Sequence, residues 1–359
     1  MTARENLLAA FSHRTPERIP WVPLVGGVNT PAFVPADSPA QTDEIALGMF
    51  LQDRFGCDLL VNGSAVRTQS PHVTVRTSRD GDLVTRTTTI GDRELVATER
   101  ILPYAGRTSS HLERYPVQTV EDMLTLAAIM DDTTFLPDPG PLAGVMQRVG
   151  NRGLVQVGGL RTPLMQLIID YMGLETFIGL WCDEPERTEQ LLATMQATQL
   201  RRCRTIAASA CEVVGSYDDT STQLISPDMF RHFVLPALSE YAAICHAAGK
   251  CLLMHSCGHV REFLPLYREA AIDVHHYLAL PPVGNTTIAE AVRDYGDAVT
   301  ALVAVDPVML ERASAGEVKD HVRGMLDAAR GWPSFAVITA SKPQVPEANL
   351  AAVAAVLRG

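Results

Sequence analysis

Lysine is scarce in this sequence of 359 residues. Only Lys250, Lys319 and Lys342 are lysines among its 30 basic residues, so few side chains could form a Schiff base. The chain also lacks a basic stripe, and its formal net charge is −11. This charge balance argues against nucleic acid as a partner, and it leaves room for a small anionic molecule held by a local arginine.

Long apolar runs and paired cysteines are missing as well. No uninterrupted apolar run approaches 18 residues, so we expect no membrane span. The polar, helix-forming start MTARENLLAAF does not have the pattern of a secretory signal. The seven cysteines are odd in number and scattered through apolar segments, which is typical of reduced thiols. We therefore expect a cytoplasmic protein, either a monomer or a homodimer.

What the sequence does have is a regular alternation of apolar strands and helical segments. Eight strands separated by helices predict an α/β fold, a (β/α)₈ TIM barrel formed by one domain over residues 1–359. A doubly wound open sheet is the alternative, but no GxGxxG motif follows the first strand. The predicted strands are 20–25, 58–62, 154–158, 212–217, 251–255, 273–277, 300–305 and 335–339.

One segment departs from this alternation. Residues 72–103 are rich in Thr and Val, alternate in polarity, and contain the turn signals Asp80-Gly81 and Gly91-Asp92. This pattern predicts a β-hairpin or small meander. It stands between the second and third predicted strands, so we expect an insertion into the barrel.

The candidate metal ligands are His255 and Cys257. Active sites of such barrels lie at the C-terminal ends of the strands, and these residues stand at the end of the fifth strand. Residues two apart on a strand project to the same side. An imidazole and a thiolate together suit zinc, which in catalytic sites has three protein ligands and one open position. The alternative is a hydrogen-bonded histidine beside an inert thiol.

A third zinc ligand is not identified by spacing. Strand ends offer Asp218, Asp219, His275, His276 and Asp306 as candidates. Asp218 and Asp219 are also the candidate catalytic carboxylates. Adjacent residues of a strand point in opposite directions, so we expect only one of the two to face the site. A capping or loop role is the alternative for both.

Four residues are candidates for substrate binding. Arg161 follows a Gly-Gly pair and could hold a substrate carboxylate with two hydrogen bonds, or else form a structural ion pair. Asn29, Tyr217 and His276 stand at the ends of the first, fourth and sixth predicted strands. Packing is the alternative role for Tyr217.

Four sequence blocks, in order along nearly the whole chain, resemble the uroporphyrinogen decarboxylase superfamily. Within this superfamily, the blocks most resemble those of the corrinoid-dependent zinc methyltransferases and demethylases. The blocks are TARENLLAAFSHRTPERIPW (2–21), YDDTSTQLISPDMFRHFVLPAL (217–238), LLMHSCGHVREFLPLYREAAIDV (252–274) and SKPQVPEANLAAVAAV (341–356).

The resemblance implies one of two chemistries. One is decarboxylation of uroporphyrinogen without a cofactor. The other is methyl transfer between a corrinoid protein and a small substrate, with zinc held by a His-x-Cys pair and a later cysteine. His255 and Cys257 match the pair, but residues 338–342 read Ile-Thr-Ala-Ser-Lys where the later cysteine is expected. The third ligand would then be a carboxylate or a histidine.

The sequence of the loop after the first strand favours one of the two reactions. The decarboxylase binds its polyanionic substrate through an arginine-rich loop, whereas residues 25–33 read VGGVNTPAF. Burying several carboxylates without cations is costly. We therefore expect a zinc-dependent methyltransferase that demethylates a small methoxy or methylthio compound. The DxHxxG corrinoid signature is missing, so the corrinoid would be carried by a separate partner protein. The alternatives are a cofactor-free decarboxylase of a smaller carboxylate and a non-catalytic binding protein.

Overall fold

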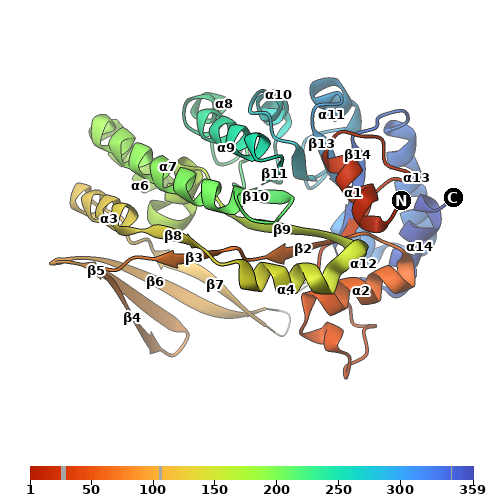
Figure 1. The fold of residues 1–359 in the computed structure, drawn as a ribbon, viewed down its shortest axis with the longest axis horizontal. Helices are drawn as coiled ribbons and strands as arrows, with labels where there is room; N and C mark the ends of the chain where they lie inside the picture. Colours follow the sequence, from red (N-terminus) through yellow and green to blue (C-terminus); the bar gives the residue numbers. More distant parts are fainter. Residues whose placement is uncertain (26–29, 105–106, 341) are drawn as a thin grey trace.

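The computed structural model describes residues 1–25, 30–104, 107–340 and 342–359. Its main sheet has eight parallel strands in the order β1-β14-β13-β12-β11-β10-β9-β2, and Figure 1 shows helices packed around them. The strands are β1 (Trp21–Pro23), β2 (Leu59–Gly63), β9 (Gly153–Leu160), β10 (Val213–Tyr217), β11 (Cys251–His255), β12 (Val274–Leu278), β13 (Thr300–Ala304) and β14 (Phe335–Thr339).

The sheet is closed into a barrel at the seam between β1 and β2. The N–H of Asp58 donates to the carbonyl of Trp21 at 2.7 Å, and the N–H of Trp21 donates to the Asp58 carboxylate at 3.0 Å. Arg18 donates to the same buried carboxylate at 2.8 Å, which compensates its charge. The predicted (β/α)₈ barrel is thus confirmed, and all eight predicted strands correspond to observed ones.

Two apolar layers hold the barrel together. Leu60, Leu154, Val213 and Leu253 belong to the cluster that fills its interior, and a larger cluster lies between the strands and the surrounding helices. Helix α1 (Ala3–Phe11) contributes Leu7, Ala10 and Phe11 to the interior cluster. It therefore closes the N-terminal end of the barrel, and chemistry is left to the opposite end.

Two helical segments around the barrel are interrupted by π-helical turns. One segment consists of α5 (Pro163–Gln166), a π-helical turn η3 (Leu167–Met172) and α6 (Gly173–Asp183). The other interrupted segment consists of α8 (Pro227–Met229), the π-helical turn η4 (Phe230–Val234) and α9 (Leu235–Ala247).

The remaining helices are continuous elements of the outer layer. The α-helices are α2 (Glu44–Phe55), α3 (Val120–Asp132), α4 (Pro139–Val149), α7 (Pro185–Ala207), α10 (Leu264–Glu269), α11 (Ile288–Tyr295), α12 (Pro307–Arg312), α13 (Ala315–Ala328) and α14 (Glu347–Leu357). Short 3₁₀ turns are η1 (Pro39–Gln41), η2 (Gly150–Arg152) and η5 (Arg261–Phe263). No helix in the described part of the chain is long and apolar enough to cross a membrane.

The insertion is larger than the sequence pattern predicts. It holds a four-stranded antiparallel sheet of β4 (Val73–Asp80), β5 (Leu83–Ile90), β6 (Arg93–Tyr104) and β7 (Arg107–Arg114). The turns at Gly81 and Gly91 have φ of 60°, which glycine adopts readily. A further pair, β3 (Val66–Gln69) with β8 (Thr134–Pro137), joins this sheet to the barrel (Figure 1).

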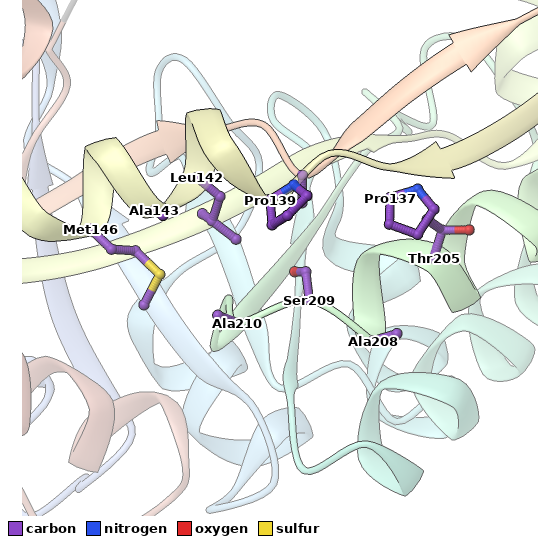
Figure 2. A pocket seen from close by; sticks show the side chains of 10 residues that line it. Pro137, Pro139, Leu142, Ala143, Met146, Thr205, Ala208, Ser209 and Ala210 are labelled. Atoms are coloured by element: carbon purple, nitrogen blue, oxygen red, sulfur yellow. The ribbon is translucent and has the colours of Figure 1, made fainter.

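An apolar groove of about 490 Å³ lies on the side of the barrel between α4 and the C-terminal end of α7. Figure 2 shows the small or apolar side chains that line it, among them Ala143, Met146, Ala208 and Ala210. The groove has no titratable lining residue, so it is not a candidate for catalysis.

Candidate active site

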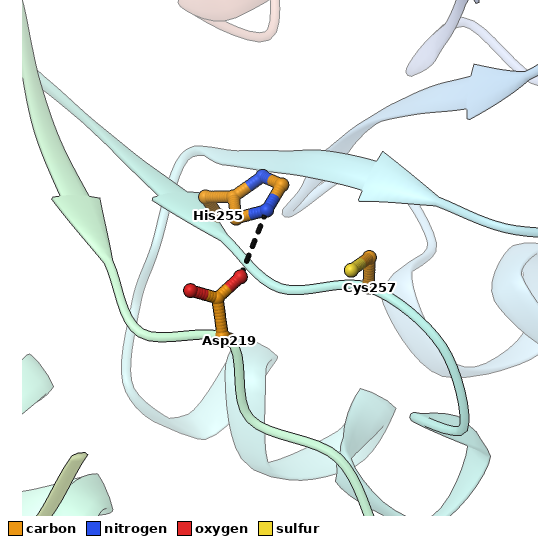
Figure 3. A group of neighbouring side chains, drawn as sticks. All are labelled: Asp219, His255 and Cys257. Carbon is orange, nitrogen blue, oxygen red and sulfur yellow. Dashed lines mark ion pairs between the residues drawn. The ribbon is translucent and has the colours of Figure 1, made fainter. Parts of the chain in front are cut away.

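The candidate site lies where β10 and β11 end side by side. The carbonyl of His255 accepts hydrogen bonds from the N–H groups of Asp218 at 3.1 Å and Asp219 at 3.2 Å, which fixes one strand end against the other. Asp219 has a φ of 50°, in the left-handed region that aspartate tolerates better than most residues. Its carboxylate consequently faces the end of β11 (Figure 3).

Asp219, His255 and Cys257 form one cluster of potential metal ligands. Nε2 of His255 lies 3.1 Å from Oδ1 of Asp219, and one donor atom from each of the three residues lies within 4.8 Å of the others. Figure 3 shows the carboxylate and the thiol on the same side of the imidazole ring. Within the described residues no other group of three such side chains meets this criterion.

The charges of this cluster stabilise a protonated His255 when no metal is bound. Burial by itself lowers the pKa of His255, but hydrogen bonds and charge from Asp219 and Cys257 outweigh burial and raise this pKa to about 9. The hydrogen bond to His255 in turn lowers the pKa of Asp219. A divalent cation between the three side chains would replace the proton on Nε2 and balance the same negative charge.

Three further rings surround His255. Nδ1 of His276 lies 2.9 Å from Nδ1 of His255, and the rings of Tyr217 and Tyr277 lie 5.9 and 5.5 Å from that of His255. Burial, and then the charge of His255, lower the pKa of His276 to about 3, so His276 is neutral. The ring of Tyr277 borders the site as well.

Tyr217 points into the barrel and is held by polar neighbours. Gln156 donates to the Tyr217 hydroxyl at 2.8 Å and to Asn62 at 3.0 Å. A Cβ atom at Gly158 would lie 2.6 Å from the Tyr217 ring, so this glycine provides the space for it. Burial raises the pKa of Tyr217 to about 12, which keeps the hydroxyl protonated as a hydrogen-bonding group.

The structure places Asp218 away from the ligand cluster. Its carboxylate is fully buried and accepts hydrogen bonds from the Thr162 N–H at 2.6 Å, the Thr162 hydroxyl at 2.7 Å and the Ser216 hydroxyl at 2.6 Å. Burial raises the pKa of Asp218, and these hydrogen bonds oppose the effect. Asp218 thus connects the ends of β9 and β10, while Asp219 alone faces His255.

The Arg161 side chain forms hydrogen bonds and ion pairs within the protein. Its Nε donates to the Tyr217 carbonyl at 2.6 Å, and Nη1 contacts both carboxylate oxygens of Asp170 at 2.8 and 2.9 Å. Nη2 also lies 3.8 Å from Asp219. The guanidinium is therefore placed to hold Asp219 and the end of β10. Asn29 lies outside the described residues.

The remaining ligand candidates do not join the cluster. His275 contacts the Ser256 carbonyl at 3.0 Å and the Tyr295 hydroxyl at 2.8 Å, inside the barrel wall. Asp306 accepts hydrogen bonds from the N–H groups of Val308 and Met309 and caps α12. Of the five candidates, only Asp219 completes a group of three potential ligands with His255 and Cys257, whereas His276 contacts His255 through Nδ1.

Sequence reasoning missed a buried hydroxyl network behind the cluster. Thr220, Ser256 and Tyr267 hydrogen-bond to one another at 2.7 to 2.9 Å. Thr220 follows Asp219, and Ser256 separates His255 from Cys257, so the network holds both backbones that carry the ligands. Its only sequence signal is that small hydroxyl residues stand next to the ligands, which is too common to be informative.

A small cavity of about 90 Å³ shares Tyr277 with the surroundings of the cluster. It is lined at the ends of β1, β12 and β14 by Leu24, Tyr277, Ile338 and Ala340, with Lys342 at its polar side. Lys342 also forms an ion pair with Glu311 at 3.5 Å. The lining residues are apolar apart from Tyr277, Thr339 and Lys342, and a mostly apolar lining is common in small-molecule sites.

Eight parallel strands with polar side chains at their C-terminal ends are the architecture of TIM-barrel enzymes. A family model described as uroporphyrinogen decarboxylase (URO-D) matches residues 111–358, and the chain belongs to this family. No curated protein sequence matches the chain.

A solved methyltransferase structure supports the (β/α)₈ fold. A methyltransferase from Methanosarcina mazei has 13% sequence identity and a TM-score of 0.61, and the match covers 100% of this chain and 98% of that one. D-psicose 3-epimerase from Clostridium cellulolyticum H10 has 11% identity and a TM-score of 0.37, and the match covers 62% of this chain and 82% of the epimerase. The first likeness extends over the whole chain, including the insertion.

Proposed function

We propose that this protein is a methyltransferase that uses zinc bound by Asp219, His255 and Cys257. The observation that carries the proposal is the convergence of a carboxylate, an imidazole and a thiol at the ends of β10 and β11. Three protein ligands of these types, with one position left for substrate, are the pattern of catalytic zinc. The chain has no cysteine near residue 340 that could be the third ligand. In this proposal Asp219 is the third ligand.

The substrate class follows from the surroundings of the cluster. Zinc in this position would act as a Lewis acid on a substrate ether, thioether or thiol. Tyr277 and the apolar residues of the small cavity would hold the body of a small methoxy or methylthio compound, and Arg161 would hold Asp219 in place. The methyl group would pass to or from a corrinoid on a separate protein. Likeness to the Methanosarcina mazei methyltransferase favours this class over decarboxylation.

Metal analysis is the direct test. Protein purified without chelator is expected to hold about one zinc per chain, and His255→Ala and Cys257→Ser are expected to lose it. Cys182→Ser is the matched control, because Cys182 is an exposed free thiol on α6. Wild-type protein without zinc, or variants that keep it, would contradict the proposal.

Activity distinguishes methyl transfer from decarboxylation. Methylcobalamin with small thiols, and cob(I)alamin with methoxy or methylthio compounds, serve as probes, because each reaction changes the absorbance of the corrinoid. We expect turnover that chelator abolishes. Release of CO₂ from uroporphyrinogen or a smaller carboxylate in the presence of chelator would instead establish the decarboxylase alternative.

A further inference from the structure

His276 contacts the ring nitrogen of His255 that faces away from the ligand cluster. Nε2 of His255 lies beside Asp219, whereas Nδ1 lies 2.9 Å from Nδ1 of His276. Among the described residues, His276 is the one hydrogen-bonding partner of this Nδ1. The two ring nitrogens of His255 therefore have different partners, Asp219 at Nε2 and His276 at Nδ1.

The proton on His255 decides whether it can bind a metal through Nε2. A neutral imidazole carries one N–H, so Nε2 has a free lone pair only when the proton is on Nδ1. An N–H in a site this enclosed needs an acceptor. Asp219 is on the other side of the ring, so the acceptor is the unprotonated Nδ1 of His276.

The backbone holds His276 in the position that this role requires. His255 and His276 are paired neighbours in the register of β11 and β12, and the Ser256 N–H donates to the His276 carbonyl at 3.0 Å. His276 is only 7% exposed, so a charge on it would be poorly solvated. A neutral His276 keeps a lone pair on Nδ1 and places its own proton on Nε2.

We infer that His276 is a positioning residue that fixes the tautomer and orientation of His255, and this inference rests on the proposed zinc site. It gives His276 a role different from the substrate binding expected from sequence. Partners of this kind on metal-bound histidines commonly change metal affinity by about 10- to 100-fold when removed. His276 acts through His255 and does not touch the metal.

Two substitutions separate positioning from packing. His276→Leu removes the acceptor, and His276→Asn keeps an acceptor oxygen near the position of Nδ1. We expect zinc affinity, measured by competition with a chromophoric chelator, to fall about 10- to 100-fold in His276→Leu and to stay within about threefold in His276→Asn. His232→Leu is the control, because its side chain is 59% exposed and lies on η4. Melting of the metal-free variants monitors folding.

The tautomer of zinc-loaded wild-type protein gives an independent readout by long-range ¹H–¹⁵N NMR. A proton on Nδ1 of His255 and zinc on Nε2 support the inference, and the reverse arrangement overturns it even if His276→Leu fails to fold. Equal zinc affinity of His276→Leu and wild type also overturns it while the zinc site stands. Wild-type protein that binds no zinc removes the proposed function and the inference together.

Discussion

Asp218 and Asp219 are adjacent residues with opposite surroundings. Asp218 is fully buried and has three hydrogen-bond donors around it, whereas the side chain of Asp219 is 43% exposed and faces His255. The same kind of side chain therefore stabilises the fold at one position and is available for a ligand at the next. This contrast gives a pair of substitutions with separable effects.

We predict that Asp219→Asn lowers zinc affinity at least about tenfold. It should change the stability of the metal-free protein little above about pH 9, where the ion pair with His255 no longer contributes. Asp218→Ala is predicted to lower the free energy of unfolding by roughly 3 kcal/mol, because it removes three hydrogen bonds and leaves buried donors unpaired. Chelator competition and urea denaturation measure the two effects. Equal loss of stability in both variants would contradict these assignments.

The charge on His255 predicts a pH dependence for the metal-free protein. The pKa of His255 is raised from 6.5 to about 9, since Asp219 and Cys257 outweigh the lowering by burial. Folding then favours the protonated form, so this stabilisation is fully present below about pH 6.5 and is lost as pH rises through about 9. Urea denaturation at several pH values is expected to show this decline, and the decline should be smaller in His255→Gln.

At the residue scale, the sequence predicted where His255 and Cys257 lie because His255 ends an apolar strand and Cys257 stands two residues later. It did not select Asp219 from the carboxylates and histidines at the other strand ends. Alternation along a strand implied that one aspartate faces the site, but the positive φ of Asp219 depends on how the chain leaves β10. That path is set by contacts with β11 that are remote in sequence.

At the scale of elements, the contact between β2 and β9 depends on a glycine. A Cβ atom at Gly153 would lie 2.3 Å from both the carbonyl oxygen and the Cβ atom of Leu59, and backbone atoms cannot move aside easily. The two residues are paired in the parallel register of these strands. Gly153 therefore allows the close approach of β9 to β2.

We predict that Gly153→Ala lowers the free energy of unfolding by about 1–3 kcal/mol, as overpacking commonly does. Gly144→Ala is the matched control in the interior of α4, where an added methyl group meets no atom within 4 Å. That change is expected to stabilise by about 0.5–1 kcal/mol, since alanine favours the helix. Chemical denaturation compares both, and a Gly153→Ala protein as stable as wild type would refute the packing argument.

Elements with strong periodicity were predicted well, and weakly patterned ones were not. The barrel strands follow continuous apolar runs. Strands β7 and β8 were missed because RTSSHLER is polar on both faces and TFLP is short. They form because neighbouring strands supply their hydrogen bonds. The π-helical turns η3 and η4 have no pattern that separates them from an α-helix.

At the scale of the whole molecule, closure of the barrel depends on a buried charge at the β1–β2 seam. The carboxylate of Asp58 is fully buried, and burial raises its pKa although hydrogen bonds and charge from Arg18 oppose this. We predict that Arg18→Ala lowers the free energy of unfolding by about 3–5 kcal/mol, because it leaves Asp58 without its cation. Urea denaturation measures the loss.

The control for this prediction is the double variant Arg18→Ala/Asp58→Asn. Removing the charge together with its partner is expected to recover part of the stability, because breaking one side of a buried pair costs more than replacing both. A double variant that is less stable than Arg18→Ala would contradict this account, because Asp58→Asn removes the charge and keeps an oxygen that can accept from the Trp21 N–H.

The sequence by itself determined the barrel and the position of its site. Eight apolar strands separated by helices leave few ways to bury their surfaces, and parallel strands bring their C-terminal ends to one face. Only the tertiary structure decided which side chains meet there. Asp219 joins His255 and Cys257 because β10 and β11 are neighbours in the closed sheet, and His276 meets His255 through the register of β11 with β12. Register and closure depend on contacts between residues far apart in the chain, which local patterns do not encode.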